Sequence, residues 1–369
     1  MSSKLMKRVL LALFAITLLS ACSNEELGEY YPDISTQELH YISRSGNIVE
    51  FNDDSFDAPI LSNTYENGKG VVRFASSLRS IGFLGSLDIT SITIPTTVKM
   101  FDGNPFRNCK NLARFISTYT TSDGYGLVCD GELIALARNY RGEKYDIPYG
   151  VKSIGQSAFY GTSIKSITIP NSITKIGDKA FYDCKQLEEL VLPAHLEELG
   201  REVCVDCISL KAVTLPRNLD ISDDFAGFTG CYNLKYFSGE CASADGRCLV
   251  VNKRVYAFAP AELSEYTIAE DITAIADRSF AKCDRLLKVT IPSSVISLGS
   301  GAFYNCTKLS EIYLEPTTPP TIKRSEGGID PFENIDNNYT LYVPSSSLTK
   351  YTGNTDWARY EAHIKTYSK

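Results

Sequence analysis

The residues with the greatest potential for chemistry are the cysteines. The chain has 11 of them, and two have the spacing of a redox or metal motif, Cys204-Val205-Asp206-Cys207. A zinc site would need a second cysteine pair or several histidines, and the region offers only His195. Both cysteines also fall where a repeated pattern, described below, places inward-facing residues. We therefore interpret them as core residues and expect neither a metal nor another cofactor.

Other catalytic arrangements are missing from the sequence. The histidines, His40, His195 and His363, lie in separate regions, and there is no nucleophile elbow, phosphate loop or dinucleotide fingerprint. Acidic pairs such as Glu188-Glu189 are adjacent in sequence, so in a strand their side chains would point to opposite faces. We therefore expect that this protein is not an enzyme.

A fixed period in the sequence predicts the elements that position these residues. The strings Ile-Thr-Ile-Pro at 167–170, Leu-Val-Leu-Pro at 190–193 and Val-Thr-Leu-Pro at 213–216 place their prolines 23 residues apart, twice. Related strings occur at 92–95, 289–292 and 312–316. The alternation predicts a short strand with every second side chain inward, and proline ends it because it lacks the N–H for the next rung.

The interval between these strands is patterned as well. An Ile-Gly or Leu-Gly step is followed by a small residue and an aromatic one, and then by a cysteine three residues later, as in Ala180-Phe181 and Cys184. We read this segment as one helical turn with Phe181 and Cys184 both inward. The cysteines at this position, predicted to be free thiols in the core, are Cys109, Cys184, Cys207, Cys231, Cys283 and Cys306.

This repeat resembles the BspA-like class of bacterial leucine-rich repeats, whose unit is close to I-P-x-S-V-x-x-I-G-x-x-A-F-x-x-C-x-x-L-x-x-I. The resemblance covers roughly residues 72–316, with two interruptions. It implies a mainly β leucine-rich-repeat solenoid with repeats of about 23 residues, in which stacked coils bury one continuous core. We place this solenoid at 37–316. Some members of the class bind extracellular-matrix proteins, so the resemblance implies a non-catalytic binding protein.

Two longer segments interrupt the period and resemble each other. They lie near 117–147 and 239–266, and each reads as two strands around a polar turn, at 129–132 and at 251–254. We expect two β-hairpins there, and a third, diverged copy at 39–60. Residues 317–369 should form a loop and a C-terminal capping unit. This unit contains Trp357 and a short helix capped by Thr355 or Asp356.

The N-terminus has the layout of an export signal. Three cations, Lys4, Lys7 and Arg8, precede an apolar run at 9–19, which is too short to span a membrane. The run ends in Leu-Ser-Ala-Cys, which resembles the lipobox of bacterial lipoproteins. The resemblance implies a signal peptide at 1–21, lipidation of Cys22 and a tether at 22–36. The acidic residues after Cys22 resemble the surface-export signal of Bacteroidota lipoproteins. They imply an outer-membrane lipoprotein exposed at the cell surface.

The charge and the aromatic residues bear on the partner. Removal of the three cations of the export signal changes the formal charge from -7 to -10. An acidic chain is a poor ligand for nucleic acid. We therefore expect a host or bacterial surface protein as partner, or a glycan. The outward positions of the strands before the prolines form a row that could act as a broad, shallow contact face. Alternatively, the row consists of ordinary Ser and Thr residues on a solvated sheet. The candidate binding residues in this row are Tyr236, Lys288, Glu311 and Tyr313.

Two further expectations concern individual residues. A glycan-binding accessory lipoprotein is the alternative function, with Tyr236, Tyr256 or Trp357 stacking on sugars. Cys241 and Cys248 flank a short turn outside the repeat pattern. Because export leads to an oxidising compartment, this pair is the candidate for a disulfide.

Overall fold

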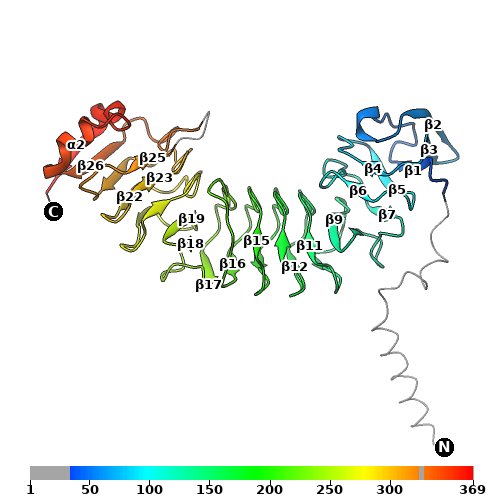
Figure 1. Cartoon of the computed structure of the whole chain (residues 1–369), viewed down its shortest axis with the longest axis horizontal. Coiled ribbons are helices and arrows are strands. Elements are labelled where there is room, and N and C mark those ends of the chain that lie inside the picture. The colour runs from blue at the N-terminus through cyan, green and yellow to red at the C-terminus, as the bar shows by residue number, and fades with distance from the viewer. Residues whose placement is uncertain (1–33, 324–327, 369) are drawn as a thin grey trace, which may run out of the picture.

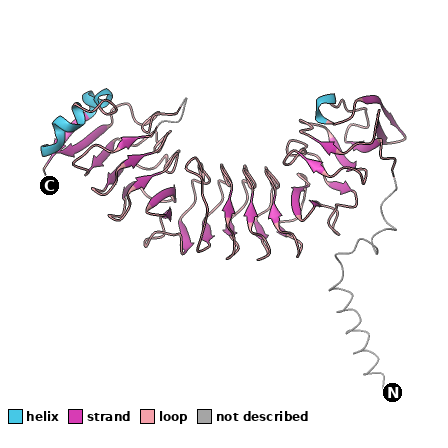
Figure 2. Ribbon diagram, in the orientation of Figure 1, coloured by secondary structure: helices cyan, strands magenta, loops and turns pink. Residues whose placement is uncertain are grey.

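The computed structural model describes residues 34–323 and 328–368. In this part of the chain the coils stack into an arch, with the N-terminal unit at one end and the C-terminal unit at the other (Figure 1). Strands run along the whole stack, whereas helices occur only in the two end units (Figure 2). The predicted mainly β solenoid is thus confirmed. The predicted signal peptide and Cys22 lie outside the described residues.

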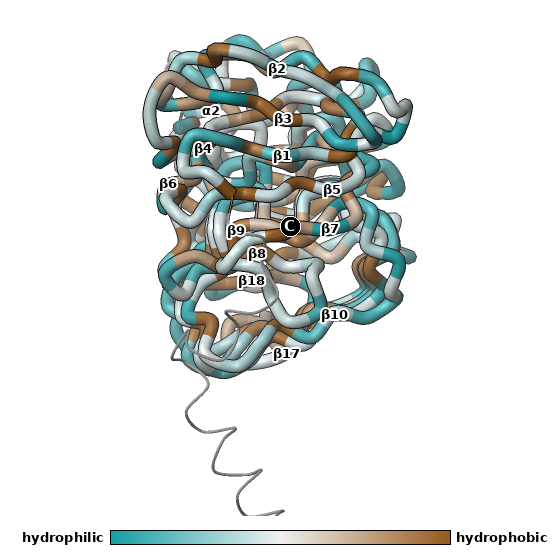
Figure 3. Tube along the Cα trace, turned by 90° about the vertical axis from the view of Figure 1, so that its right-hand side faces the viewer, coloured by the Kyte–Doolittle hydropathy of each residue, from teal (hydrophilic) through white to brown (hydrophobic). Residues whose placement is uncertain are grey.

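The longer strand of each coil is the alternating segment before the proline. Its central residues, such as Leu190 and Val213, are at most 1% exposed and pair in parallel register one coil apart. Burial of such a side chain contributes about 1.5–3 kcal/mol. Hydrophobic and hydrophilic residues alternate around the coils (Figure 3). These strands form the long-strand face: β5 (Ile89–Thr93), β7 (Arg114–Ile116), β10 (Lys144–Asp146), β12 (Ser166–Thr168), β14 (Glu189–Val191), β16 (Ala212–Leu215), β17 (Tyr236–Gly239), β20 (Glu265–Thr267), β22 (Lys288–Ile291), β24 (Glu311–Leu314) and β26 (Thr340–Pro344).

A second, shorter strand in each coil contains the Ile or Leu that precedes the repeated glycine. The glycine is required because neighbouring coils touch there: a Cβ on Gly177 would lie 2.7 Å from the backbone nitrogen of Gln156. On Gly200 it would lie 2.4 Å from that of Asp178. These strands form the short-strand face: β4 (Ser80–Ile81), β6 (Met100–Phe101), β9 (Glu132–Leu136), β11 (Ser153–Ile154), β13 (Lys175–Ile176), β15 (Glu198–Leu199), β19 (Arg254–Phe258), β21 (Ala274–Ile275), β23 (Ser297–Leu298) and β25 (Thr321–Ile322).

The segment around the repeated phenylalanine forms successive tight turns and not the predicted helical turn. Lys179 and Asp183 have φ values of 58° and 60°, which no right-handed helix allows. The reason is that backbone N–H groups here bond to the next coil, as Phe159 N–H does to Ala180 O at 2.8 Å. The predicted inward register is nevertheless correct, because Phe181 and Cys184 are fully buried.

The repeated cysteines link successive coils through hydrogen bonds. The thiol of Cys184 donates to Phe159 O and the thiol of Cys207 donates to Phe181 O, each at 3.0 Å. A buried carbonyl without a partner would cost about 1–3 kcal/mol, so a small apolar residue with a donor suits this position. All ten cysteines within the described residues are buried and free. The prediction of unpaired core thiols is confirmed at the repeat positions.

Two β-hairpins interrupt the short-strand face. In the first, β8 (Gly126–Cys129) pairs antiparallel with β9, and in the second, β18 (Cys248–Val251) pairs with β19. Both turns are left-handed at two residues: φ is 51° and 81° at Asp130 and Gly131, and 50° and 61° at Asn252 and Lys253. This geometry matches the twist of the flanking strands. β9 and β19 also continue the parallel ladders, whereas β8 and β18 are additional strands.

The N-terminal unit corrects one prediction. β1 (Glu38–Ser43) pairs with β3 (Lys69–Phe74) and β5, and residues 48–52 contain no strand, so no hairpin forms at 39–60. The hairpin of this unit is β2 (Ile60–Glu66) with β3, through left-handed Asn67 and Gly68. An Asn-Gly step is a strong hairpin signal that the prediction overlooked. The 3₁₀ helix η1 (Asp53–Ser55) completes the unit.

The C-terminal unit covers the last coil. β26 pairs with β27 (Ile364–Tyr367), and η2 (Ser345–Ser347), α2 (Leu348–Thr352) and η3 (Ala358–His363) lie between them. Trp357 is fully buried and donates from its indole nitrogen to Pro320 O at 2.7 Å. Trp357 itself is the N-cap of η3 and makes no side-chain cap hydrogen bond, so the predicted cap by Thr355 or Asp356 is wrong.

Candidate functional site

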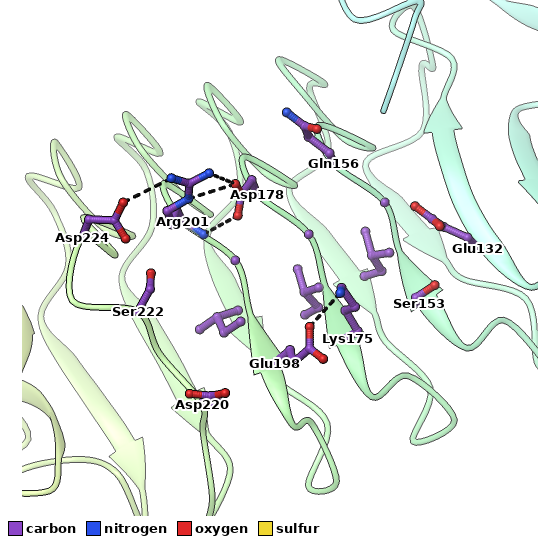
Figure 4. A pocket seen from close by; sticks show the side chains of 16 residues that line it. Glu132, Ser153, Gln156, Lys175, Asp178, Glu198, Arg201, Asp220, Ser222 and Asp224 are labelled. Carbon is purple, nitrogen blue, oxygen red and sulfur yellow. Dashed lines mark hydrogen bonds and ion pairs between the residues drawn. The ribbon is translucent and has the colours of Figure 1, made fainter. Parts of the chain in front are cut away.

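A groove of about 660 Å³ follows the short-strand face across the middle of the arch (Figure 4). Its floor is formed by β9, β11, β13 and β15, and polar side chains stand in two rows along it. These residues were not predicted, because outward positions were considered only in the longer strands. The same 23-residue period would have placed them together. The row beside the buried Ile and Leu residues is Glu132, Ser153, Lys175, Glu198 and Asp220, and the second row is Gln156, Asp178, Arg201 and Asp224.

Ion pairs between neighbouring coils dominate the groove. Arg201 donates to Asp178 Oδ2 from Nε at 3.0 Å and from Nη2 at 2.8 Å, and its Nη1 reaches Asp224 Oδ2 at 3.1 Å. Lys175 Nζ lies 2.7 Å from Glu198 Oε2. Hydrogen bonds to these carboxylates raise the pKa of Arg201 and of Lys175, so both remain cations.

The groove is acidic despite these pairs. Five carboxylates line it, against the two cations Lys175 and Arg201. Asp220 is exposed, and neither Asp220 nor Glu132 forms an ion pair within the described chain. Burial raises the pKa of Glu132, because its carboxyl packs over Gly155 at the N-terminal end of the groove. The surplus negative charge suits a positively charged partner.

Two further hollows continue the groove toward the C-terminus. A hollow of about 560 Å³ shares Asp220 with the groove and extends to β18. A smaller one of about 220 Å³ shares Glu240 and Val250 with that hollow and ends against Asp271 and Ile272. The groove and the two hollows therefore form a line of adjoining depressions, whose middle lies where the ladder of short strands meets the second hairpin.

The structure brings together three of the four predicted binding residues. Lys288 and Glu311 are paired on β22 and β24, and Lys288 Nζ lies 5.2 Å from the ring centroid of Tyr313. Tyr313 stacks on Tyr342 with centroids 4.5 Å apart. Tyr342 was missed, although its outward position follows from the alternation in the strand at 340–344. Tyr236 is 48% exposed but lies on β17, in a different sheet.

The aromatic residues considered for sugar stacking are mostly inaccessible. Trp357 is fully buried and Tyr256 is 8% exposed, so neither can present a ring face to a ligand. One face of Tyr313 meets Lys288 and the other meets Tyr342. Only Tyr236 among the proposed residues offers an exposed ring. The prediction that Trp357 or Tyr256 stacks on sugars is therefore wrong.

The candidate disulfide is not formed in the structure. Cys241 donates its thiol to Arg217 O at 3.3 Å, whereas the thiol of Cys248 lies 3.4 Å from the hydroxyl of Tyr266. Burial raises the pKa of Cys248 to about 12, which keeps it a thiol. The described residues contain no cluster of His, Cys, Asp and Glu able to hold a metal ion.

The three histidines lie in separate parts of the chain, and none of them lines the groove. His40 pairs with Glu38 at 2.8 Å in the N-terminal unit, and His363 stacks on Tyr339 in the C-terminal unit. His195 is exposed on a turn between β14 and β15. No described helix is long and apolar enough to cross a membrane.

Stacked coils, a buried Phe and Cys column and two parallel ladders define a leucine-rich-repeat solenoid. The chain belongs to the family described as the BspA type leucine rich repeat region, of which six copies match residues 35–123, 138–243 and 253–352. The repeat class predicted from the sequence is thus confirmed.

Solved structures of similar proteins come from several bacteria. A leucine-rich repeat protein from Bacteroides ovatus is 24% identical over 79% of this chain and 71% of that one, with a TM-score of 0.46. A leucine rich cell surface protein from Faecalibacterium prausnitzii is 18% identical over 83% and 85% of the two chains, with a TM-score of 0.40. No curated protein matches the chain.

Proposed function

We propose that this protein is a non-catalytic surface lipoprotein that binds a host or bacterial surface protein. The observation that carries the proposal is the acidic groove of about 660 Å³ on the short-strand face. It is an open depression across several coils, which suits a macromolecule better than an enclosed small-molecule site. A lipid anchor at Cys22 in the outer membrane would hold the protein at the cell surface.

The ion pairs of the groove are exposed, so a partner can replace one member of a pair. The side chains of Lys175 and Glu198 are 58% and 56% exposed, and that of Arg201 is 54% exposed. Ion pairs at such exposure contribute about 0.2–1 kcal/mol, so a partner can displace them at low cost. The surplus carboxylates Glu132 and Asp220 would then attract a basic partner, and added salt should weaken the complex.

A glycan remains a second candidate ligand because Tyr236 is 48% exposed. A sugar ring could stack on it without displacing another side chain. The Tyr236→Ala variant tests this function on a polysaccharide array. Glycan binding would be supported if the wild-type protein is retained on the array and Tyr236→Ala is not. Unchanged retention of Tyr236→Ala would remove Tyr236 from consideration.

Charge reversal tests the groove directly. We would measure binding of the protein to immobilised matrix proteins, mucins and bacterial surface proteins by surface plasmon resonance. Glu198→Lys and Asp220→Lys should each weaken binding to the recognised protein by about tenfold or more, as expected for residues within an interface. Glu311→Lys on the long-strand face is the control, because it makes the same charge change outside the groove.

Two results would contradict the proposal. Equal binding by the groove variants and the wild type, with loss in Glu311→Lys, would move the site to the long-strand face. Turnover of ester, peptide or glycoside substrates would contradict the absence of catalysis. Protease treatment of intact cells, with Cys22→Ala as the control, tests the anchor: the wild-type protein should be digested at the cell surface, whereas protection until lysis would place it inside the envelope.

A further inference from the structure

The ladder of short strands is interrupted between β15 and β18. β11, β13 and β15 pair over two residues each, but the next coil adds only a single bridge, between Glu198 and Asp220. Its one ladder hydrogen bond runs from Asp220 N–H to Glu197 O at 2.9 Å. The next strand along the stack on this side is β18, the edge strand of another sheet. The hollow of about 560 Å³ lies at this interruption, lined by Leu219 and Asp220 and by Val250, Val251 and Asn252.

The first hairpin shows what fills the equivalent position elsewhere in the chain. Tyr119 lies just before β8 and donates its hydroxyl to Thr96 O at 2.9 Å. Cys241 lies just before β18 and donates its thiol to Arg217 O at 3.3 Å. Thr96 and Arg217 each follow the proline that ends a long strand. The two side chains therefore make the same contact, but the cysteine side chain is much smaller than the tyrosine side chain.

The edge of β18 is covered only in part. Val250 N–H donates to Cys241 O at 2.7 Å and Ser243 N–H donates to Cys248 O at 2.8 Å, so residues 241–243 pair with most of the strand. Val251 and Asn252 extend past these bonds and line the hollow. The hollow thus lies between a ladder that ends in a single bridge and the uncovered end of a strand. An extended chain that enters it would find backbone on both sides, as in strand addition.

The side chains around the hollow specify the kind of chain. Its apolar lining consists of Leu219, Cys241 and the valines of β18. Its charged lining consists of Glu197, Asp220 and Glu240, and the one cation, Arg217, is 2.8 Å from Glu240. A strand presents successive side chains to opposite sides. A segment with alternating apolar and basic residues would therefore place apolar groups on the floor and cations beside the carboxylates.

We propose that the hollow between Asp220 and β18 accepts a short extended segment of a protein partner, with alternating apolar and basic residues, as an added strand. The inference rests on the proposed protein-binding function and names the part of the partner that is recognised. Backbone hydrogen bonds would supply affinity, and the alternate pockets and carboxylates would supply specificity.

The test uses a five-residue peptide in which lysine alternates with valine, and fluorescence anisotropy with the whole protein. A peptide in which glutamate replaces lysine is the charge control. The lysine peptide should bind, and the glutamate peptide should bind at least about tenfold more weakly. N-methylation of alternate backbone nitrogens should also weaken binding by about tenfold or more, because it removes the donors of an added strand. Equal binding of the methylated peptide would overturn strand addition.

Cys241→Tyr provides the decisive variant, because it places at the second hairpin the residue that the first hairpin already holds at this position. It should fill the hollow, keep the contact to Arg217 O and reduce peptide affinity by about tenfold or more, whereas Cys241→Ser should stay within about twofold. Asp220→Lys should also weaken binding, and thermal unfolding of each variant reports whether it folds. A folded Cys241→Tyr protein with wild-type peptide affinity would overturn the inference.

The outcome also separates this inference from the proposed function. If Glu198→Lys weakens binding of a partner protein but Cys241→Tyr does not, the groove binds its partner without an added strand. If neither variant affects any partner protein, the proposed function fails as well. Absence of any binding by the lysine peptide would overturn the added strand alone.

Discussion

The two hairpins occupy equivalent positions in the sequence, but different side chains connect them to the neighbouring coil. Equivalent residues of β8 and β18 lie 122 positions apart, as Gly126 and Cys248 do, and both hairpins turn through two left-handed residues. At the first hairpin, Tyr119 reaches across to Thr96 O. At the second, Cys241 makes the same contact with a smaller side chain, beside a hollow of about 560 Å³. One substitution within a repeated unit thus changes the side chain at the joint between coils while the hydrogen bond to the neighbouring coil is kept.

The tyrosines beside the two hairpins, Tyr145 and Tyr266, also differ in burial and in hydrogen bonding. Tyr145 packs against Gly126 and is 1% exposed, and its hydroxyl has no hydrogen-bond partner in the described chain. At the second hairpin Tyr266 is less buried and donates to Asp245 Oδ2 at 3.1 Å, with the thiol of Cys248 nearby. The tyrosine at the first hairpin is therefore held by packing, whereas the tyrosine at the second also makes a polar side-chain contact.

The largest effect on stability should follow when Gly126, which packs against Tyr145, is replaced by the cysteine found at the equivalent position of the second hairpin. In Gly126→Cys the new Cβ would lie 2.5 Å from the hydroxyl oxygen of Tyr145 and 2.8 Å from Cγ2 of Thr121. Overpacking of this kind costs about 1–3 kcal/mol. Denaturant unfolding should show this loss. The same experiment on Gly82→Ala provides a control, because a Cβ there would meet no atom closer than 3.5 Å. Unchanged stability of Gly126→Cys would mean that the first hairpin is not closely packed.

A smaller effect on stability should distinguish Tyr266 from Tyr145 when each loses its hydroxyl group. Tyr266→Phe removes the hydrogen bond to Asp245 and should lower the free energy of unfolding by about 1 kcal/mol. Tyr145→Phe removes a hydroxyl without a partner and should change it by less than about 0.5 kcal/mol, or stabilise the protein. Thermal melts of both variants check the difference. A reversed order would show that the buried hydroxyl of Tyr145 is satisfied.

The smallest effect concerns pH. Glu132 and Arg254 occupy equivalent positions at the starts of β9 and β19. Burial raises the pKa of Glu132, so its carboxylate destabilises the fold above that raised pKa and the cost vanishes as pH falls. The pKa of Asp223 is lowered, chiefly by its hydrogen bond from Arg254, so its contribution is present near neutral pH and lost in acid.

The two carboxyl groups should therefore respond to substitution with opposite signs. Glu132→Gln should raise stability slightly near pH 7, and Asp223→Asn should lower it by less than about 1 kcal/mol, since the Asp223 side chain is 60% exposed. The Glu132 difference should fade as pH falls toward about 4.3, whereas the Asp223 difference should fade only below about pH 3.9, because folding lowers the pKa of Asp223. Unfolding curves at several pH values test this, and effects of equal sign would contradict the assigned environments.

Much of the fold could be predicted because burial imposes a period on the sequence. The inward register of Phe181 and Cys184, and the turns of both hairpins, follow from residue types at fixed spacing. The N-terminal hairpin was misplaced because apolar alternation at 39–42 outweighed the Asn67-Gly68 turn. The helical turn was wrong because coil-to-coil hydrogen bonds, which no local pattern records, force left-handed residues such as Lys179.

The candidate site was harder to predict for a physical reason. Outward residues of a solenoid carry no burial pattern, so Lys175, Glu198 and Arg201 look like ordinary surface charges until stacking brings them together. The hollow lies beside Cys241, at the position that Tyr119 occupies in the first hairpin. Alignment of the two hairpins in the sequence would show that difference, but only the structure shows the space that it leaves.

Hydrogen exchange of the protein saturated with the lysine–valine peptide tests the central claim, that the partner binds on the short-strand face, most directly. Amides of an occupied edge exchange slowly because added strands protect them. We expect slower exchange at residues 197–200, 217–222 and 250–252, with no change on β22 and β24. Protection of β22 and β24 with unchanged exchange at 217–222 would contradict it.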